Sequence, residues 1–107
     1  MLFRSGLCFV NLVDFDTEFG HRNNVDGYAE NLSNIDYQLG KLLKILTEED
    51  VLIITADHGC DPATESTDHS RENVPVLIYQ KGKPSKNLGI LNSFAEIGKI
   101  ALNSLKI

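Results

Sequence analysis

The feature that most constrains the fold is an amphipathic pattern at residues 25–46, which lies between two short apolar runs. The runs "LCFVNLVD" at 7–14 and "VLIITAD" at 51–57 are bounded by polar segments, which is typical of buried strands. Between them, apolar residues recur in steps of four and three, as on one face of a helix: Tyr28, Leu32, Ile35, Leu39, Leu42 and Leu46. Buried strands joined through a long helix imply a parallel β-α-β crossover.

Two more elements follow along the chain. The run "VPVLIYQ" at 74–80 predicts a third strand, with Pro75 at its entry. Residues 93–107 predict a final helix, because Ser93 and Glu96 have the spacing of a capping box. Its predicted buried face is formed by Phe94, Ile97, Ala101 and Leu105. The order is strand, helix, strand, strand, helix, so the chain is predicted to be α/β. In open sheets of this kind, ligands bind at the carboxyl ends of the strands.

Composition narrows the class of protein. A chain of 107 residues fits one small domain, and 42% apolar residues indicate a globular rather than a disordered chain. The net charge of −5 and the scattered Lys and Arg argue against nucleic-acid binding. No apolar run approaches the roughly 20 residues that a membrane-spanning helix needs. The two cysteines have no CxxC spacing and nothing indicates secretion, so we expect free thiols and a cytoplasmic location.

All three histidines lie near carboxylates in loops that leave predicted strand ends. His21 follows Asp16, His58 follows Asp57 directly, and His69 comes eleven residues after His58. Imidazole and carboxylate together suit Mn²⁺, Zn²⁺ or Fe²⁺. One such residue alone is more often a solvated or turn-capping side chain. Three such sites in one small α/β chain favour metal binding, and two strand ends could hold a pair of ions that acts on a phosphoryl group.

Other polar residues of this region are less specific. The hydroxyls of Thr67 and Ser70 could act as nucleophiles, but turn hydrogen bonding is the more frequent role. Arg71 could pair with a phosphate or with the neighbouring Glu72. A nucleophile pair of Cys60 with His58 is disfavoured, because near neighbours in sequence rarely have the required geometry.

Four blocks of the chain resemble, in order, the phosphopentomutase family of the alkaline phosphatase superfamily. They are "NLVDFDTEFGHRNN", "ILTEEDVLIITADHGCDP", "TDHSRENVPVLIY" and "LGILNSFAEIGKIAL". The resemblance runs from about Gly6 to the C-terminus. It implies a three-layer α/β/α sandwich with a mostly parallel sheet, of which residues 1–107 form a truncated, single partial domain. This would be the C-terminal portion of the catalytic domain.

The resemblance also implies an activity and a ligand set. Phosphopentomutases interconvert the 1-phosphates and 5-phosphates of ribose and deoxyribose in nucleoside catabolism, using two Mn²⁺ ions and a phosphothreonine. By position, one ion would be bound by Asp16, His21 and His69, and the other by Asp57 and His58. Asp14 and Asp61 would support these ligands through hydrogen bonds. Zn²⁺ or Fe²⁺ remain alternatives on ligand type alone.

The chain departs from the family pattern in two ways. Family members are several times longer, and their N-terminal part supplies a further Asp ligand, the threonine nucleophile and a cap that holds the pentose phosphate. No catalytic residue is therefore assigned in this chain, and we expect it to be inactive alone and to self-associate or need the missing portion. Ser66 also stands where the family usually has Gly. The alternatives are another superfamily member, such as a cofactor-independent phosphoglycerate mutase or a phosphatase, and a non-catalytic remnant that binds metal or a partner.

Overall fold

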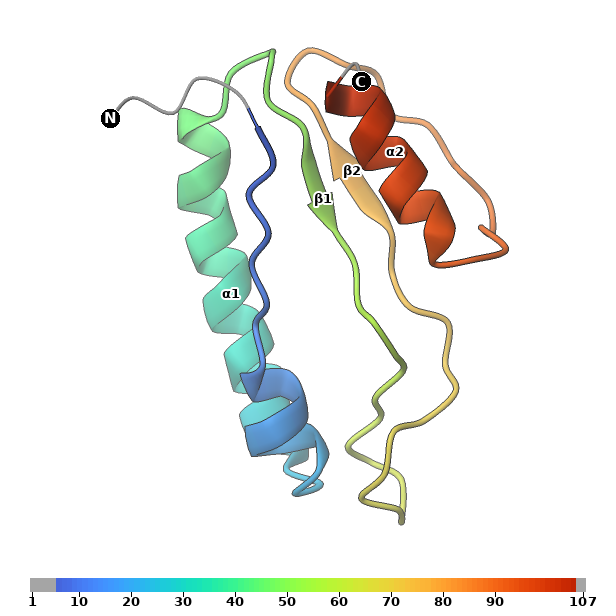
Figure 1. The fold of residues 1–107 in the computed structure, drawn as a ribbon. Helices are drawn as coiled ribbons and strands as arrows, with labels where there is room; N and C mark the ends of the chain where they lie inside the picture. Colours follow the sequence, from blue (N-terminus) through green and yellow to red (C-terminus); the bar gives the residue numbers. More distant parts are fainter. Residues whose placement is uncertain (1–5, 106–107) are drawn as a thin grey trace. The chain divides into compact units, whose positions relative to one another are not determined.

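The computed structural model describes residues 6–105 and contains five elements (Figure 1). In chain order they are a π-helix, η1 (Phe15–Gly20), followed by α1 (Val25–Ile45), β1 (Leu52–Ile54), β2 (Leu77–Tyr79) and α2 (Ala95–Leu105). The chain divides into two compact units. One unit is Leu12–Gly82 and contains every predicted metal ligand, while the other combines the N-terminal segment up to Asn11 with Lys83–Ile107. Within the described residues, no helix is both long and apolar enough to cross a bilayer.

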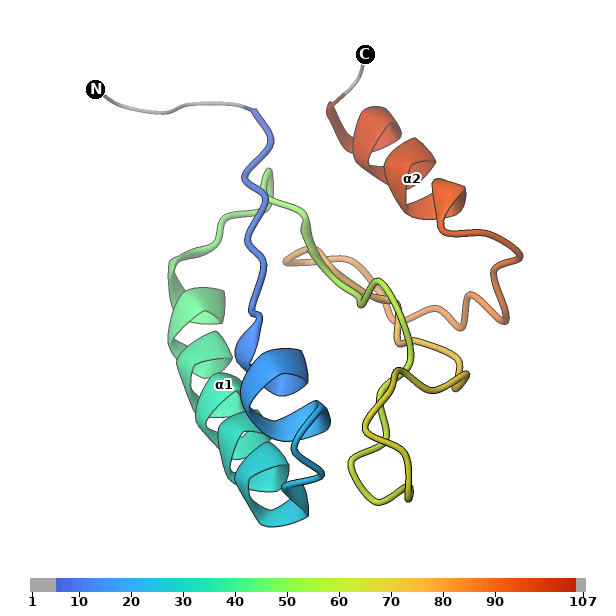
Figure 2. The ribbon, with the colours of Figure 1, turned by 60° about the horizontal axis from the view of Figure 1, so that its bottom comes forward.

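Helix α1 confirms the predicted helix at 25–46 almost residue for residue. Asn24 caps its N-terminus, where the side-chain Oδ1 accepts the N–H of Gly27 at 2.9 Å. Of the six predicted apolar positions, five are half-buried and Leu32 is exposed. The N-terminal end of α1 packs against η1, where the Phe15 and Tyr28 rings lie 5.0 Å apart. The two helices lie side by side in both ribbon views (Figures 1 and 2).

Strands β1 and β2 pair antiparallel, with Leu52 opposite Tyr79 and Ile54 opposite Leu77. The predicted strands at 51–57 and 74–80 are thus present but only three residues long. The chain between them leaves and returns as two irregular arms (Figure 2). A second antiparallel bridge joins these arms at Gly59 and Ser70, where the Ser70 N–H donates to the Gly59 carbonyl at 3.2 Å. Residues 52–79 therefore form one long hairpin.

The predicted strand at 7–14 is wrong, because no strand forms before η1 in the described residues. The parallel crossover through α1 is consequently not formed either. The apolar side chains of this segment are exposed, Phe9 by 84%. A strand exists only when a neighbour satisfies its backbone groups, and no described segment pairs with residues 7–14. Among residues 6–105 no hydrophobic side chain is fully buried, so the predicted burial of the strands is not observed.

Helix α2 confirms the predicted final helix, although residues 106–107 lie outside the described part. Only half of the predicted capping box forms. The Ser93 hydroxyl accepts the N–H of Ala95 at 3.1 Å, but the Glu96 carboxylate pairs with Lys99 at 3.0 Å. The predicted buried face is half-buried at Ile97, Ala101 and Leu105, whereas Phe94 is 59% exposed and its predicted burial is wrong.

Candidate metal centre

The π-helical turn η1 brings Asp16 and His21 onto one face. In an α-helix, side chains five residues apart point about 140° away from each other. In η1 the His21 N–H instead bonds to the Asp16 carbonyl at 2.9 Å, which is the i to i+5 bond of a π-turn. The His21 Nε2 consequently lies 3.3 Å from Asp16 Oδ1. The spacing D-x-x-x-x-H thus places a carboxylate and an imidazole side by side.

Gly20 allows this turn to approach the hairpin. It is one of the two buried residues among those described. A Cβ at this position would meet Cys60 Sγ at 2.5 Å and the Phe15 carbonyl oxygen at 2.8 Å. A larger residue would therefore clash with the backbone of η1 itself at Phe15, and would displace the Cys60 side chain on the hairpin arm that carries His58.

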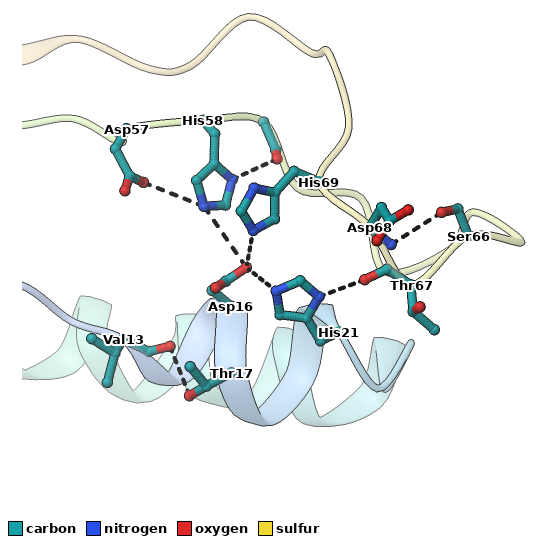
Figure 3. A network of polar contacts seen from close by, with 11 residues as sticks. Val13, Asp16, Thr17, His21, Asp57, His58, Ser66, Thr67, Asp68 and His69 are labelled. Atoms are coloured by element: carbon teal, nitrogen blue, oxygen red, sulfur yellow. Dashed lines mark hydrogen bonds and ion pairs between the residues drawn. The ribbon is translucent and has the colours of Figure 1, made fainter.

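His58 and His69 lie on opposite arms of the hairpin, beside the Gly59–Ser70 bridge. Their rings are stacked, with centroids 3.5 Å apart and planes 9° from parallel. The Nε2 atoms lie 3.8 Å (His58) and 3.2 Å (His69) from Asp16 Oδ1. Figure 3 shows the three imidazoles converging on this one carboxylate oxygen. Ligand atoms of Asp16, His58 and His69 all lie within 4.8 Å of one another.

Backbone carbonyls determine the tautomers of two of these rings. His58 Nδ1 lies 2.9 Å from the Gly59 carbonyl, and His21 Nδ1 lies against the Thr67 carbonyl. Because a carbonyl only accepts hydrogen bonds, both Nδ1 atoms carry the hydrogen. In the neutral rings, each Nε2 then turns a lone pair toward Asp16. Carbonyl partners of this kind are the usual orienting groups of metal-bound histidines.

Asp16 Oδ1 is buried and accepts no hydrogen bond from any described residue. A buried carboxylate oxygen that faces imidazole nitrogens needs a proton or a metal cation between itself and them. Ligands held about 2.0–2.1 Å from one tetrahedral ion lie roughly 3.3–3.4 Å apart. The oxygen-to-nitrogen distances of 3.2, 3.3 and 3.8 Å bracket that separation. The residues present therefore fit a divalent cation.

The surrounding charge also favours a cation. Burial first, and then the negative charges of Asp16, Glu72 and Asp61, raise the pKa of the Cys60 thiol. Burial, Cys60 and Asp61 likewise raise the pKa of Tyr28. The thiol of Cys60 and the phenol of Tyr28 therefore both lie in a region of negative electrostatic potential beside the imidazole cluster.

The other predicted residues lie less centrally. Asp57 Oδ1 is 3.5 Å from His58 Nε2, but the Asp57 side chain is 88% exposed. Asp14 is the N-cap of η1 and makes no side-chain cap hydrogen bond. Asp61 Oδ1 accepts the N–H of Ala63 at 2.9 Å, so that carboxylate caps its own turn. The hydroxyl of Ser70 is buried and has no hydrogen-bond partner among the described residues. Thr67 contacts His21 Nδ1 through its backbone carbonyl rather than through its hydroxyl.

Asn23 was missed by sequence reasoning. Its side-chain amide donates to carbonyls of the loop that precedes His69, and its φ of 50° is in the left-handed region. The signal in the sequence was a polar residue two positions after the predicted ligand His21, whereas the partners of Asn23 lie about 40 positions away in the chain.

Residues 3–107 match the metalloenzyme superfamily, and the chain belongs to that superfamily. Membership implies an alkaline phosphatase-like fold and the use of divalent metal.

Within the superfamily, the chain is similar to phosphopentomutases. It is 56% identical to that of Lachnoclostridium phytofermentans over 103 residues, which cover 95% of this chain and 26% of that protein. It is 54% identical to that of Clostridium kluyveri over 105 residues (97% and 27%). It is 58% identical to that of Buchnera aphidicola over 93 residues (87% and 23%). The chain therefore spans about a quarter of the length of these curated relatives.

Proposed function

We propose that this chain holds divalent cations for a phosphopentomutase-type isomerase reaction. That reaction moves a phosphoryl group between the 1- and 5-positions of ribose or deoxyribose. The observation that carries the proposal is the convergence of three imidazole Nε2 atoms on Asp16 Oδ1, a buried oxygen that accepts no hydrogen bond from the described residues. The similarity to phosphopentomutases supports the pentose phosphate as substrate.

Two ions, Mn²⁺ in preference to Zn²⁺ or Fe²⁺, would divide the ligands between them. His21 and His69 are the two imidazoles nearest to Asp16, at 3.3 and 3.2 Å, which supports these three residues as one set. The ligand atoms that all lie within 4.8 Å of one another belong instead to Asp16, His58 and His69, so an ion in the first set would have to draw His21 closer to His69. His58 Nε2 is closer to Asp57, at 3.5 Å, than to Asp16, at 3.8 Å. That difference supports His58 and Asp57 as part of the second set.

The ions would activate an oxygen nucleophile and offset charge on the transferring phosphoryl group. The chain's own contribution is orientation. The carbonyls of Gly59 and Thr67 hold His58 and His21 with Nε2 turned toward Asp16. The nucleophile, the remaining Asp ligand and the other strands of a parallel three-layer sandwich would come from the part of such an enzyme that these residues do not represent. We expect residues 1–107 alone to bind metal in the cytoplasm without mutase turnover.

A second candidate is a segment that binds metal or a partner chain and takes no part in turnover. It is favoured by the exposure of large apolar side chains throughout the described residues, because such surfaces usually contact another chain. Self-association is the simplest form of that contact. Both candidates predict no turnover of ribose 5-phosphate by this chain alone, so turnover above that of a His58→Ala variant would exclude a purely non-catalytic role.

The test of the metal centre is calorimetric titration of the metal-stripped chain with Mn²⁺ and with Zn²⁺. Asp16→Asn should abolish binding, and Asp57→Asn should weaken only the second ion. Asp36→Asn is the matched control, because Asp36 is an exposed residue of α1 and undergoes the same chemical change. If Asp16→Asn binds Mn²⁺ as tightly as the wild type does, the proposed centre is refuted.

A further inference from the structure

We propose that Asn23 is a positioning residue that holds the loop 61–67 in place, so that the Thr67 carbonyl and His69 reach the metal ligands. The inference rests on the proposed metal centre. Asn23 is not itself a ligand, and it acts through the loop to which it is bonded.

The side-chain amide of Asn23 is the point at which the loop carbonyls converge. Nδ2 donates to the carbonyls of Thr64 at 2.6 Å and Ser66 at 3.0 Å, and it lies 3.3 Å from that of Pro62. These bonds join positions 39 to 43 residues apart in the chain. An amide has only two N–H groups, so three acceptors saturate it. A half-buried amide bonded in this way ties the loop to the turn after η1.

The loop transmits this attachment to the ligands through its own hydrogen bonds. The Thr64 hydroxyl contacts the carbonyls of Asp61 at 2.9 Å and Ser66 at 3.2 Å. The Ser66 hydroxyl accepts the N–H of Asp68 at 3.0 Å, directly before His69. In Figure 3 the segment from Ser66 to His69 lies over His21, whose Nδ1 contacts the Thr67 carbonyl. The turn after η1 therefore contacts the loop at two points, through the side chain of Asn23 and through the imidazole of His21.

The residue type at position 23 fits this role. Its φ of 50° is a conformation that Gly adopts freely and that Asn and Asp tolerate better than other residues. Of these three, only Asn has side-chain N–H groups to donate. Asn23→Gly therefore removes the donor while keeping the backbone conformation. Asn23→Asp keeps the shape but turns a carboxylate toward the loop carbonyls.

The experiment combines two measurements on the full 107-residue chain. Hydrogen exchange of residues 61–67 and the imidazole ¹⁵N spectrum of His21, both recorded without metal, report on the attachment itself. Calorimetric titration with Mn²⁺ reports on its consequence for the ligands. In both variants we expect faster exchange in the loop and a shift of His21 from the single Nδ1–H tautomer toward a mixture. Mn²⁺ affinity should fall about 10- to 100-fold, as is usual when a group that orients a ligand is removed.

Asn24→Ala is the matched control. It removes the neighbouring Asn side chain, which caps α1 and makes no hydrogen bond to the loop within the described part of the chain. That variant should lose thermal stability while retaining the His21 tautomer and the Mn²⁺ affinity. A general loss of structure would instead lower Mn²⁺ affinity in all three variants.

The proposal is overturned if Asn23→Gly and Asn23→Asp both keep loop protection and the wild-type tautomer, or if Asn24→Ala loses as much affinity as they do. Should Asn23→Asp fail to fold, Asn23→Gly decides alone. If the wild-type chain does not bind Mn²⁺, the metal centre is refuted. The metal-free measurements then still decide whether Asn23 holds the loop.

Discussion

Replacing Gly59 by Ala should separate the two hairpin arms at the metal centre. A Cβ there would lie 2.6 Å from the Ser70 carbonyl oxygen and 2.7 Å from the Glu72 nitrogen. Both are backbone atoms, so rotation of a side chain cannot relieve the contact. Reaching the 3.4 Å at which ordinary van der Waals contact begins requires a movement of about 0.8 Å between the arms. Because His58 and His69 flank these residues, their Nε2 atoms would move by a comparable distance.

Such a movement exceeds the tolerance of about 0.5 Å within which binding groups must be held. We expect Mn²⁺ affinity of Gly59→Ala to fall at least roughly 10-fold. The overpacked bridge should cost about 1–3 kcal/mol of unfolding free energy. Calorimetry and urea denaturation measure the two effects.

Gly40→Ala is the matched control, because a Cβ at position 40 of α1 meets nothing within 4 Å. That change should stabilise the helix by about 0.5–1 kcal/mol and leave Mn²⁺ affinity unchanged. Wild-type affinity in Gly59→Ala would show that the bridge does not set the spacing of the histidines.

Two further predictions concern ionisation. Because the pKa of the Cys60 thiol is raised, less of it is in the reactive thiolate form at pH 8. In a Cys8→Ser variant, iodoacetamide should therefore alkylate Cys60 more slowly than it alkylates the thiol of an unstructured peptide. An equal or faster rate would contradict this prediction. Hydrogen bonds from the N–H and hydroxyl of Thr47, at 2.7 and 2.9 Å, lower the pKa of Asp50. As the pH falls, the Asp50 carboxylate therefore becomes protonated in the unfolded chain before it does so in the folded chain. The stability that these hydrogen bonds supply is complete above about pH 4, and it is lost as the pH falls through the lower pKa of the folded state. NMR titration of the Asp50 carboxyl tests this, and a Thr47→Ala variant should bring its pKa back toward the ordinary value.

The helices were predictable because their signals are local. The stripe from Tyr28 to Leu46 and the cap at Asn24 lie within the segment that forms α1, and the same holds for Ser93 at α2. Helical hydrogen bonds join residues four apart, so a helix needs no distant partner to satisfy its backbone.

The strands were less predictable because the pairing of a strand depends on a second segment elsewhere in the chain. The apolar run at 7–14 has the composition of a strand but no neighbour among the described residues. The runs at 51–57 and 74–80 do pair, yet only over three residues each and antiparallel. Strand direction depends on the connection between the paired segments, and here the 22 residues between Ile54 and Leu77 return as hairpin arms rather than as a helix.

The candidate ligands illustrate what residue type and spacing leave undetermined. Sequence named Asp16, His21, Asp57, His58 and His69 from their chemistry and from the ends of predicted strands. The structure brings four of them together without a strand before Asp16. A π-turn supplies the i to i+5 contact to His21, and the Gly59–Ser70 bridge sets His58 against His69. Both devices depend on close backbone approach at a glycine, Gly20 in one and Gly59 in the other. The geometry of the centre therefore rests in part on positions that carry no ligand, and substitutions at these glycines should weaken metal binding although both glycines lack a ligand atom.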